Sequence, residues 1–403
     1  MPKKILWISY CVPYDTVAHA GGKIENYYIK GINNQKEFDV RLISFAREDD
    51  LPKIDLDEYG IKYKLILHHE SGLLHLWWGM WNRIRKWNFR NKYAGFVSPY
   101  VENSLKRSLS ELRAEGYNPD VIVLQWTQIV LMMKYIQKIF PGIPIVAVEE
   151  DVSYLGSKRK FEMEKKFVKK WFKKQLYNSL KTVELECLNK ASLVVLNNFK
   201  DKNLLASDGL SKNTWMWCPY FQSYIDLPYI GKNKDVIFYG AMNREENWKS
   251  AIWFIENVFS SINDENIKLY IVGNRPNSEL MKYKSERVII TGFVEDVAPY
   301  LQNAMCLVAP LLFGAGVKIK VIEAMSAGVP VLTNAVGIEG IKAENGVHYF
   351  HCENAAEYLS ALNMLINNEV DIQEISDREK SLVIANYNYE ESLKEFSDKL
   401  KLL

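Results

Sequence analysis

Residues 305–334 read MCLVAPLLFGAGVKIKVIEAMSAGVPVLTN, which contains two short apolar runs separated by a glycine-rich loop and an amphipathic segment. The pattern predicts a buried strand that ends at Pro310, a loop through LLFGAG, a helix that begins near Val317, and a second buried strand. A strand, a helix and another strand in this order favour a parallel βαβ unit, because parallel strands need a long crossover connection.

The same alternation of short apolar runs with longer amphipathic segments recurs along the chain. In the first half the predicted strands are KKILWISY (3–10), FDVRLISF (38–45), IKYKLIL (61–67), DVIVLQW (120–126), PIVAVEE (144–150) and ASLVVLN (191–197). In the second half they are DVIFYGA (235–241), IKLYIVG (267–273), VIITG (288–292), MCLVAP (305–310) and VPVLTN (329–334). Predicted helices include NWKSAIWFIENVF (247–259), APYLQNA (298–304) and KIKVIEAMSA (318–327). The sequence therefore predicts an α/β protein with two doubly wound parallel sheets.

The chain has 403 residues, which is too long for one ordinary core and suits two domains. The segment MWCPYFQSYIDLPYIGKNK (216–234) contains proline and glycine without periodicity, and we interpret it as the linker. We predict Rossmann-like domains over 1–215 and 216–384, followed by a helix over 385–403 that can cross back to the first domain.

The composition is that of an ordinary globular protein, with 48% hydrophobic residues, 25% charged residues and a net charge of +2. The five cysteines are scattered and form no C-x-x-C pair, which predicts a reduced, cytoplasmic protein without a zinc site. The N-terminal MPKKILWISYCVPYD lacks a small-residue cleavage site, so a buried strand is preferred to a signal peptide. No apolar stretch approaches the ~20 residues that a membrane-spanning helix needs.

The loop LLFGAG is predicted to present backbone N–H groups at a helix N-terminus, which favours an anion. Lys318 in the first helical turn adds a positive charge, whereas Lys320 points about 200° away around the helix and is expected to be less engaged. Glu323 can accept hydrogen bonds from vicinal hydroxyl groups. Together these features predict a nucleoside diphosphate site; the alternative is a structural turn with a surface lysine and glutamate.

Residues 291–340, TGFVEDVAPYLQNAMCLVAPLLFGAGVKIKVIEAMSAGVPVLTNAVGIEG, resemble the donor half of GT-B glycosyltransferases, in particular the large retaining family-four type (glycosyl transferases group 1). VIFYGAMNREEN, LYIVGNRPNSEL and the N-terminal AGGKIENYYIKGI support the resemblance. It implies two Rossmann-like domains facing across a cleft, the first binding the acceptor and the second the nucleotide-sugar donor.

The resemblance also implies roles for individual residues. Glu323 matches the second glutamate of the family's motif of two glutamates separated by seven residues, which binds the donor ribose. Lys318 matches the lysine of a G-A-G-x-K variant that neutralises the diphosphate. The remaining donor-binding matches are Gly314, Ala315, Gly316 and Val317 at the diphosphate or sugar, Gly292, Phe293 and Val294 at the base, and Gly21 and Gly22 where phosphate and acceptor meet.

The sequence departs from the family pattern at three places. Ala315 replaces the first glutamate of the two-glutamate motif, and the usual arginine–lysine pair is represented only by Arg244 and Lys249 in shifted places. Glu150 stands where the family has a histidine. The donor sugar and the exact catalytic groups are therefore open.

The implied reaction breaks a sugar–phosphate bond and retains the anomeric configuration, with attack on the same face assisted by the leaving phosphate. Lys318 and the 314–317 amides are expected to stabilise the leaving group without a metal ion or other cofactor. Glu150 or Gln125, each just after or at the end of a predicted strand, are the candidates to orient the acceptor; the alternative for Glu149 and Glu150 is a solvated strand end. The catalytic candidates are thus Lys318, Glu150 and Gln125.

Possible metal-binding motifs have simpler interpretations. Asp55-Leu56-Asp57 is a D-x-D sequence but follows no clear strand, so a surface turn is preferred. His348 and His351 are expected to face opposite sides of a strand, and His68-His69 has no partner at ligand spacing. We therefore predict no metal site.

Two basic, aromatic segments suggest contact with an anionic membrane surface. Residues 157–174 carry nine Lys or Arg against two Glu, with Phe161, Val168, Trp171 and Phe172 at helical spacing. Residues 72–93 carry four tryptophans, five Lys or Arg and no acid. The alternative is a solvated helix with an aromatic core face; nucleic acid is not expected, because neither segment belongs to a binding module.

The sequence therefore predicts a cytoplasmic glycosyltransferase, peripheral to the inner face of the membrane, that adds a sugar to a saccharide or lipid-linked acceptor in polysaccharide or glycoconjugate synthesis. One alternative is a sugar-nucleotide epimerase or phosphorylase on the same fold. Another is a non-catalytic nucleotide-sugar-binding subunit, because the first glutamate of the motif is missing.

Overall fold

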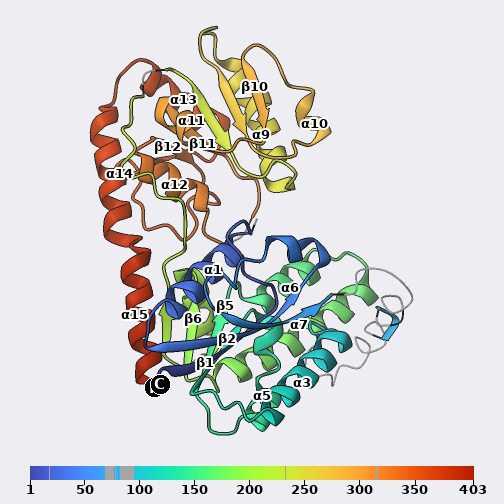
Figure 1. The fold of residues 1–403 in the computed structure, drawn as a ribbon. Helices are drawn as coiled ribbons and strands as arrows, with labels where there is room; N and C mark the ends of the chain where they lie inside the picture. Colours follow the sequence, from blue (N-terminus) through green and yellow to red (C-terminus); the bar gives the residue numbers. More distant parts are fainter. Residues whose placement is uncertain (18, 69–76, 78, 82–94, 232, 315) are drawn as a thin grey trace. The chain divides into compact units, whose positions relative to one another are not determined.

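The computed structural model describes residues 1–17, 19–68, 77, 79–81, 95–231, 233–314 and 316–403 (Figure 1). The chain forms two compact units. Unit 1 comprises Met1–Tyr220 and Tyr389–Leu403, and unit 2 comprises Phe221–Asn388. Both units are α/β, as the alternating pattern predicts.

Unit 1 contains a seven-stranded parallel sheet in the order β3-β2-β1-β4-β5-β6-β7. Its strands are β1 (Lys3–Ser9), β2 (Phe38–Ala46), β3 (Lys62–Leu67), β4 (Val121–Gln125), β5 (Ile145–Glu149), β6 (Leu193–Leu196) and β7 (Thr214–Met216). Its helices are α1 (Ala20–Asn33), η1 (Glu48–Lys53), α3 (Pro99–Ala114), α4 (Thr127–Val130), α5 (Met133–Ile139), α6 (Ser153–Glu162), α7 (Phe167–Leu188), α8 (Phe199–Ser207) and α15 (Tyr389–Leu402). The central strands β4 and β5 are buried at every residue, as expected for a parallel sheet covered on both faces.

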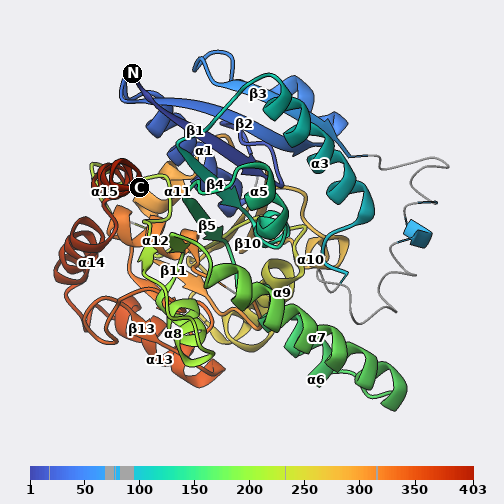
Figure 2. The same ribbon diagram turned by 90° about the horizontal axis from the view of Figure 1, so that it is seen from below.

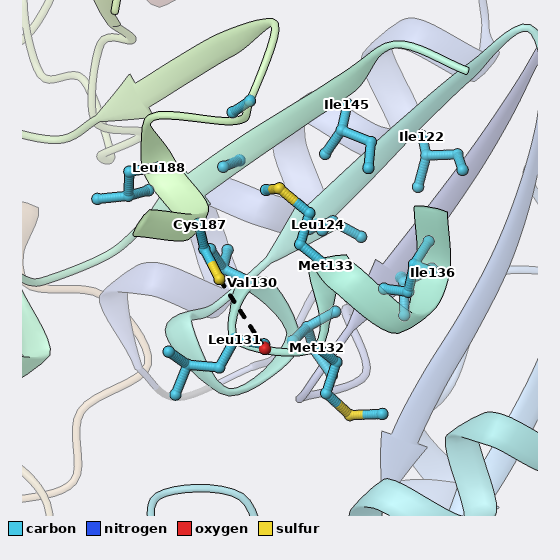
Figure 3. Packing of buried hydrophobic residues seen from close by; sticks show 14 of the residues in the cluster. Ile122, Leu124, Val130, Leu131, Met132, Met133, Ile136, Ile145, Cys187 and Leu188 are labelled. Carbon is cyan, nitrogen blue, oxygen red and sulfur yellow. Dashed lines mark hydrogen bonds between the residues drawn. The ribbon is translucent and has the colours of Figure 1, made fainter. Parts of the chain in front are cut away.

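Successive residues of β1 point into two different apolar layers. Leu6 and Ile8 join the layer that also contains Cys187, whereas Ile5 and Trp7 join the layer that contains Phe396 of α15. Figure 3 shows part of the first layer, where the Cys187 thiol lies near the Leu131 carbonyl oxygen. This alternation follows from the two-residue period of a strand and gives the sheet a core on each side.

The C-terminal helix α15 packs on the second of these layers. The Phe396 ring stacks on the Trp215 ring with a centroid distance of 5.5 Å and meets the Trp7 ring edge-on at 6.3 Å. The hydroxyl groups of Tyr28 in α1 and Ser392 in α15 are 2.6 Å apart. The last residues of the chain thus complete the core of unit 1, although they follow unit 2 in the sequence.

Unit 2 contains a six-stranded parallel sheet in the order β10-β9-β8-β11-β12-β13. Its strands are β8 (Val236–Tyr239), β9 (Leu269–Val272), β10 (Val288–Gly292), β11 (Cys306–Ala309), β12 (Val331–Thr333) and β13 (Phe350–His351). Its helices are α9 (Glu245–Asn257), η2 (Phe259–Ser261), α10 (Ser278–Met281), α11 (Ala298–Asn303), α12 (Ile319–Ala327), α13 (Ala355–Ile366) and α14 (Ile372–Asn386).

The strand order reverses once in each sheet, between β1 and β4 in unit 1 and between β8 and β11 in unit 2. In doubly wound sheets, ligands bind beyond the carboxyl ends of the strands at such a reversal. The two edges at these reversals are therefore the places to look for functional groups. No helix in the part of the chain that the structure describes is both long enough and apolar enough to cross a membrane.

Candidate functional site

The carboxyl edge of the six-stranded sheet is formed by glycines in conformations that other residues rarely adopt. Gly240 follows β8, Gly273 follows β9 and Gly314 follows β11, with φ angles of 151°, 155° and 148°. A Cβ atom on Gly273 would lie only 1.7 Å from the Gly240 carbonyl oxygen. The absence of side chains at these positions leaves backbone, rather than side chains, at the point where the strand order reverses.

The predicted loop between β11 and α12 carries the glycines and one lysine of the motif. Leu312 and Phe313 are exposed, at 47% and 41%. Gly316 has φ of 74°, and α12 begins at Ile319 rather than near Val317. The N-cap residue Lys318 makes no side-chain capping hydrogen bond to this helix, and the first amides of a helix have the capacity to bind an anion. Ala315 lies outside the described residues.

Lys318 lies at the position before the first residue of α12, not within its first turn. Its ammonium donates a 2.5 Å hydrogen bond to the Gly316 carbonyl oxygen and lies 3.9 Å from Glu339 Oε2. A Cβ atom on Gly314 would lie 3.7 Å from the same Nζ atom. The lysine charge is therefore held against the glycine loop that the sequence associates with the diphosphate.

Lys320, which was expected to be less engaged with an anion than Lys318, is directed at the end of β8. The Lys320 ammonium donates a 2.6 Å hydrogen bond to Asn247 Oδ1 and lies 4.9 Å from the centroid of the Phe238 ring. A Cβ atom on Gly240 would lie 3.0 Å from Lys320 Nζ. Burial lowers the pKa of this ammonium to about 7, and the nearby charge of Lys318 adds to the effect. The side chain of Lys320 therefore points to the end of β8. The angle between Lys318 and Lys320 around the helix axis did not predict this direction.

Glu323 lies one turn further along α12 and is fixed from two directions. Its Oε2 accepts a 2.7 Å hydrogen bond from the Tyr239 hydroxyl at the end of β8, and its Oε1 accepts a 3.2 Å bond from the Gln222 backbone N–H. An ionised carboxylate has about four acceptor positions, and the vicinal hydroxyls of a ribose are donors of the kind that it binds.

The residues predicted near the base lie at the end of β10 and directly after it. Gly292 has φ of 73°, and its carbonyl oxygen accepts a 3.1 Å hydrogen bond from the Gly273 N–H. Phe293 is 69% exposed, and Val294 follows it. The hydrogen bond joins this turn to the glycine edge after β9, so both belong to the same edge of the sheet.

Arg244 and Lys249 form ion pairs on the surface near the start of α9. Arg244 Nε lies 2.9 Å from Glu246 Oε1, and Lys249 Nζ lies 3.0 Å from Glu245 Oε2. Lys249 Nζ also lies 6.0 Å from the centroid of the Phe313 ring. Lys320, by contrast, is directed at the end of β8.

In unit 1 the predicted glycines Gly21 and Gly22 lie in the first turn of α1, which follows the loop after β1. The backbone N–H of Gly22 donates a 2.9 Å hydrogen bond to Nδ1 of His19, which caps the helix. A Cβ atom on Gly21 would lie 2.6 Å from Trp126 Cη2 and 2.8 Å from Glu150 Oε2. Glycine at position 21 therefore allows the helix to approach the ends of β4 and β5.

Glu150 and Gln125, the two acceptor-side candidates, are in direct contact. Gln125 Nε2 donates a hydrogen bond to Glu150 Oε1, and Asn197 Nδ2 donates a 2.6 Å bond to Oε2. Burial raises the pKa of the Glu150 carboxyl to about 7, and repulsion from Asp151 contributes. Glu150 is therefore not a solvated strand end, since only 8% of its surface is exposed. Asn197, which follows β6, was not predicted.

Trp126 and Glu25 complete this edge and were also not predicted. Trp126 has φ of 76°, a strained conformation for a residue other than glycine. Its indole N–H donates a 3.2 Å hydrogen bond to Glu25 Oε2, and its ring meets the His19 ring at 5.6 Å. Glu25 is fully buried, and this burial raises the pKa of its carboxyl to about 8. A signal in the sequence existed only for Trp126, because it is the last residue of the predicted strand DVIVLQW (120–126).

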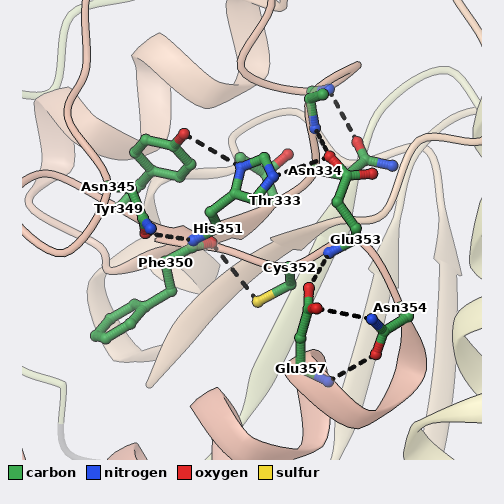
Figure 4. Close-up of polar contacts among 12 residues, drawn as sticks. Thr333, Asn334, Asn345, Tyr349, Phe350, His351, Cys352, Glu353, Asn354 and Glu357 are labelled. Carbon is green, nitrogen blue, oxygen red and sulfur yellow. Dashed lines mark hydrogen bonds and ion pairs between the residues drawn. The ribbon is translucent and has the colours of Figure 1, made fainter.

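The possible metal ligands take part in local contacts. Asp55 forms an ion pair with Lys30 at 2.7 Å. Asp57 lies in a turn, as predicted for this segment, and accepts a 2.8 Å hydrogen bond from the Tyr63 hydroxyl. His351 Nε2 lies 2.9 Å from Glu353 Oε1, as Figure 4 shows. His348 and His351 do not share a strand, because only Phe350–His351 pair with β12 and His348 lies outside it.

The two basic segments are described to different extents. Within 157–174 the chain forms the end of α6, a turn and the start of α7, and Figure 2 shows these two helices side by side. Met163, Phe167, Val168 and Trp171 are exposed at 81%, 85%, 73% and 50%. Within 72–93, residues 72–76, 78 and 82–93 lie outside the described residues, and Trp77 and Trp81 are exposed at 49% and 45%.

Comparison with curated proteins gives a partial relative. The chain is 27% identical over 214 residues to an uncharacterised 44.6 kDa protein in the cps region of Klebsiella pneumoniae. The match covers 48% of this chain and 54% of that protein, so the chain spans about half the length of this relative.

Comparison with solved structures shows the fold over the whole chain. Anabaena HepE in complex with UDP has a TM-score of 0.67 at 14% identity, with 99% of this chain and 100% of that chain covered. Sucrose-phosphate synthase from Thermosynechococcus elongatus has a TM-score of 0.67 at 14% identity, with 99% and 98% covered. Both the GT-B fold and its two Rossmann-like domains are thereby confirmed.

The family model described as glycosyl transferases group 1 matches residues 233–368. This range contains all six strands of unit 2, the glycine edge, Lys318, Lys320 and Glu323. Residues 233–368 are therefore similar to the glycosyl transferases group 1 family, within a chain that has the GT-B fold.

Proposed function

We propose that this protein is a glycosyltransferase that moves a sugar from a nucleoside diphosphate donor to a saccharide or lipid-linked acceptor. The observation that carries the proposal is the edge of unit 2, where glycine backbone, the Lys318 and Lys320 ammoniums and the Glu323 carboxylate lie together in a group 1 domain. Complexes of the similarly folded Anabaena HepE with UDP and with UDP-glucose support a nucleotide-sugar donor. The relative from a cps region supports a role in polysaccharide synthesis.

In the proposed reaction the bond between the anomeric carbon and the diphosphate oxygen breaks, and its electron pair leaves with the diphosphate. Lys318, Lys320 and the amides of the loop would stabilise the charge that develops there. The acceptor oxygen forms the new bond on the same face of the sugar, and its proton goes to the leaving phosphate. Retention in this form needs no nucleophilic side chain.

We propose that Glu150 and Gln125 of unit 1 orient the acceptor. A carboxyl group with a pKa of about 7 can both accept and donate a hydrogen bond near neutral pH, which suits a sugar hydroxyl. The hydrogen bonds from Gln125 and Asn197 fix the direction of this carboxyl.

The test is a panel of nucleotide sugars assayed for thermal stabilisation and for release of nucleoside diphosphate, with EDTA and with added Mg²⁺. Stabilisation by one donor, slow hydrolysis of it and faster release with a saccharide acceptor are expected, with equal rates in EDTA. Conversion of the donor sugar without acceptor would indicate an epimerase, and dependence on free phosphate a phosphorylase. Stabilisation without any turnover would favour a non-catalytic binding subunit and contradict the proposal.

We further propose that the exposed end of the α6–α7 pair binds an anionic bilayer at the cytoplasmic face of a membrane. Four exposed apolar side chains project there among nine Lys and Arg residues, the composition that suits an anionic membrane interface. The five cysteines are free thiols, which favours a reducing compartment.

Liposome flotation tests this surface. Wild-type protein is expected to float with vesicles that contain anionic phosphatidylserine or phosphatidylglycerol, and to be released by salt. The double variant Phe167→Ser with Trp171→Ser should bind at least tenfold more weakly, since each buried aromatic contributes about 1.5–3 kcal/mol. The matched control is Ile384→Ser, which changes an apolar residue of 60% exposure in unit 2. Equal flotation of all three proteins would contradict the assignment.

A further inference from the structure

The ammonium of Lys320 has fewer partners than its charge requires. An ammonium group has three N–H donors, and the hydrogen bond described for this one goes to a neutral amide oxygen, that of Asn247, at 2.6 Å. The described part of the chain provides no carboxylate within 4.0 Å of Lys320 Nζ. Among the described residues the largely desolvated ammonium therefore has no direct counter-ion, a state that is costly unless an anion completes it.

The position of this ammonium makes an anion reachable. It lies at the end of β8, at the point where the strand order reverses, and the missing side chain of Gly240 leaves open a position only 3.0 Å from Nζ. The Lys320 residue keeps part of its surface exposed. An anion at the glycine edge can thus approach Nζ over the backbone of Gly240.

We propose that Lys320 binds the diphosphate of the nucleotide directly and takes up a proton when the nucleotide binds. The inference rests on the proposed function. It adds Lys320 as a ligand of the diphosphate and the uptake of one proton on nucleotide binding. It replaces the expectation that Lys318 alone supplies the positive charge at this site.

The charges around Lys320 come from the two helices that pack against the strand end. Lys318 at the start of α12 and Arg244 before α9 disfavour the ammonium form, whereas Glu246 of α9 and Glu323 of α12 favour it. Burial outweighs all four charges and leaves the pKa of the free protein at about 7. A diphosphate would add a strong favourable charge, so the pKa of Lys320 must rise in the complex.

The sign of the linkage follows from these two pKa values. Well above pH 7 the free protein has mostly neutral Lys320, whereas the complex has the ammonium, so binding takes up a proton. Nucleotide affinity should then fall by up to about tenfold for each pH unit above 7, until the pKa of the complex is reached. The phosphate itself is fully ionised in this range, because its second pKa is about 6.

The experiment is calorimetric titration of the full-length protein with UDP at pH 8, in buffers of different ionisation enthalpy such as HEPES, Tricine and Tris. If UDP gives no heat, GDP is used in the same way. The dependence of the apparent enthalpy on the buffer gives the number of protons taken up. We expect a value that approaches one for wild-type protein at pH 8 and an affinity that decreases from pH 7 to pH 9.

Three variants make the measurement specific. Lys320→Met removes the charge and should bind UDP at least tenfold more weakly at pH 7, with no proton uptake. Lys320→Arg remains charged at pH 8, so it should bind without proton uptake and with little dependence on pH. The control Lys282→Met changes an exposed lysine of unit 2 that pairs with Glu279, and should behave as wild type. Thermal unfolding checks that each variant is folded. If Lys320→Met does not fold, the comparison of wild type with Lys320→Arg is sufficient for the test.

The outcomes separate this inference from the function on which it rests. Binding of UDP or GDP to wild-type protein without proton uptake at pH 8 would overturn the role of Lys320 and leave the glycosyltransferase proposal intact. Proton uptake that persists in Lys320→Arg or Lys320→Met would also overturn it. Failure of the folded protein to bind either nucleotide from pH 6 to pH 9 would overturn both proposals.

Discussion

The two sheets of this protein have the same strand order but opposite chemistry at their carboxyl edges. The edge of unit 2 is built from glycine backbone and the ammoniums of Lys318 and Lys320. The edge of unit 1 is built from carboxyl groups, those of Glu25, Glu149 and Glu150, whose pKa values burial raises. The comparison teaches that topology sets where a ligand binds, whereas the side chains at the edge set its charge.

The difference also has an electrostatic logic. A diphosphate beside three carboxyl groups would be repelled to the extent that they ionise, whereas neutral carboxyl groups can bind the hydroxyls of a sugar without net charge. Buried ammonium groups have the opposite preference and are stabilised by an anion. We therefore infer that the unit 2 edge binds the charged part of the donor and the unit 1 edge a neutral saccharide.

The substitution with the largest expected effect is Lys318→Ala, which removes a charge from the unit 2 edge. Turnover should fall by about 10²–10³, the typical loss for one group that stabilises developing negative charge. Nucleoside diphosphate release from a nucleotide sugar is the assay. Turnover at the wild-type level would show that Lys318 does not act at the diphosphate and would weaken the contrast between the two edges.

Glu25→Gln tests whether the carboxyl groups of the unit 1 edge are protonated in the folded protein. The folded pKa of Glu25 is about 8 and its ordinary value is 4.5, so the stability that its protonated form gives is present at low pH and lost as the pH rises from about 4.5 to about 8. The difference in the free energy of unfolding between the variant and wild type should therefore change between pH 5 and pH 8. It should move in favour of the variant by about 2–4 kcal/mol.

Urea unfolding of both proteins at pH 5 and pH 8 measures this difference. The matched control is Glu265→Gln, which changes an exposed carboxylate of unit 2 and should shift stability equally at both pH values. A Glu25→Gln curve parallel to wild type across the pH range would show that Glu25 is ionised in the folded state.

Glu323→Ala is expected to have a smaller effect, confined to nucleotide binding. The loss of a charge-assisted bond to the ribose corresponds to about 1.5–3 kcal/mol, or roughly tenfold to a hundredfold in affinity for UDP. Calorimetry at pH 7 is the measurement, with Glu265→Ala as control. Wild-type affinity in Glu323→Ala would limit the role of Glu323 to its bonds with Tyr239 and Gln222.

Local patterns in the sequence predicted most of the fold. Every predicted strand overlaps an observed strand, because strands buried on both faces appear as apolar runs. The strands β7 (Thr214–Met216) and β13 (Phe350–His351) were missed because three and two residues form no recognisable pattern. Gln125 and Glu150 were each placed at or just after the end of a predicted strand, and the structure brings them into contact because those two strands are neighbours.

The parts of the site that were not predicted depend on contacts between residues distant in the sequence. Trp126 and Glu25 are separated by 101 positions, and Asn197 and Glu150 by 47, so no local pattern joins them. The contacts of Lys320 were not predicted, because the angle around a helix gives no information about which strand end the side chain meets. Its partners, Asn247 and Gly240, are 73 and 80 positions away.

Hydrogen–deuterium exchange of the full-length protein with and without saturating UDP tests the contrast between the edges most directly. Backbone amides slow their exchange where a ligand binds or stabilises the local structure. We predict that peptides covering 239–247 and 312–323 are protected, while peptides covering 121–127 and 145–151 exchange as in the free protein. Protection confined to the unit 1 peptides would contradict the assignment of the nucleotide to the glycine and lysine edge of unit 2.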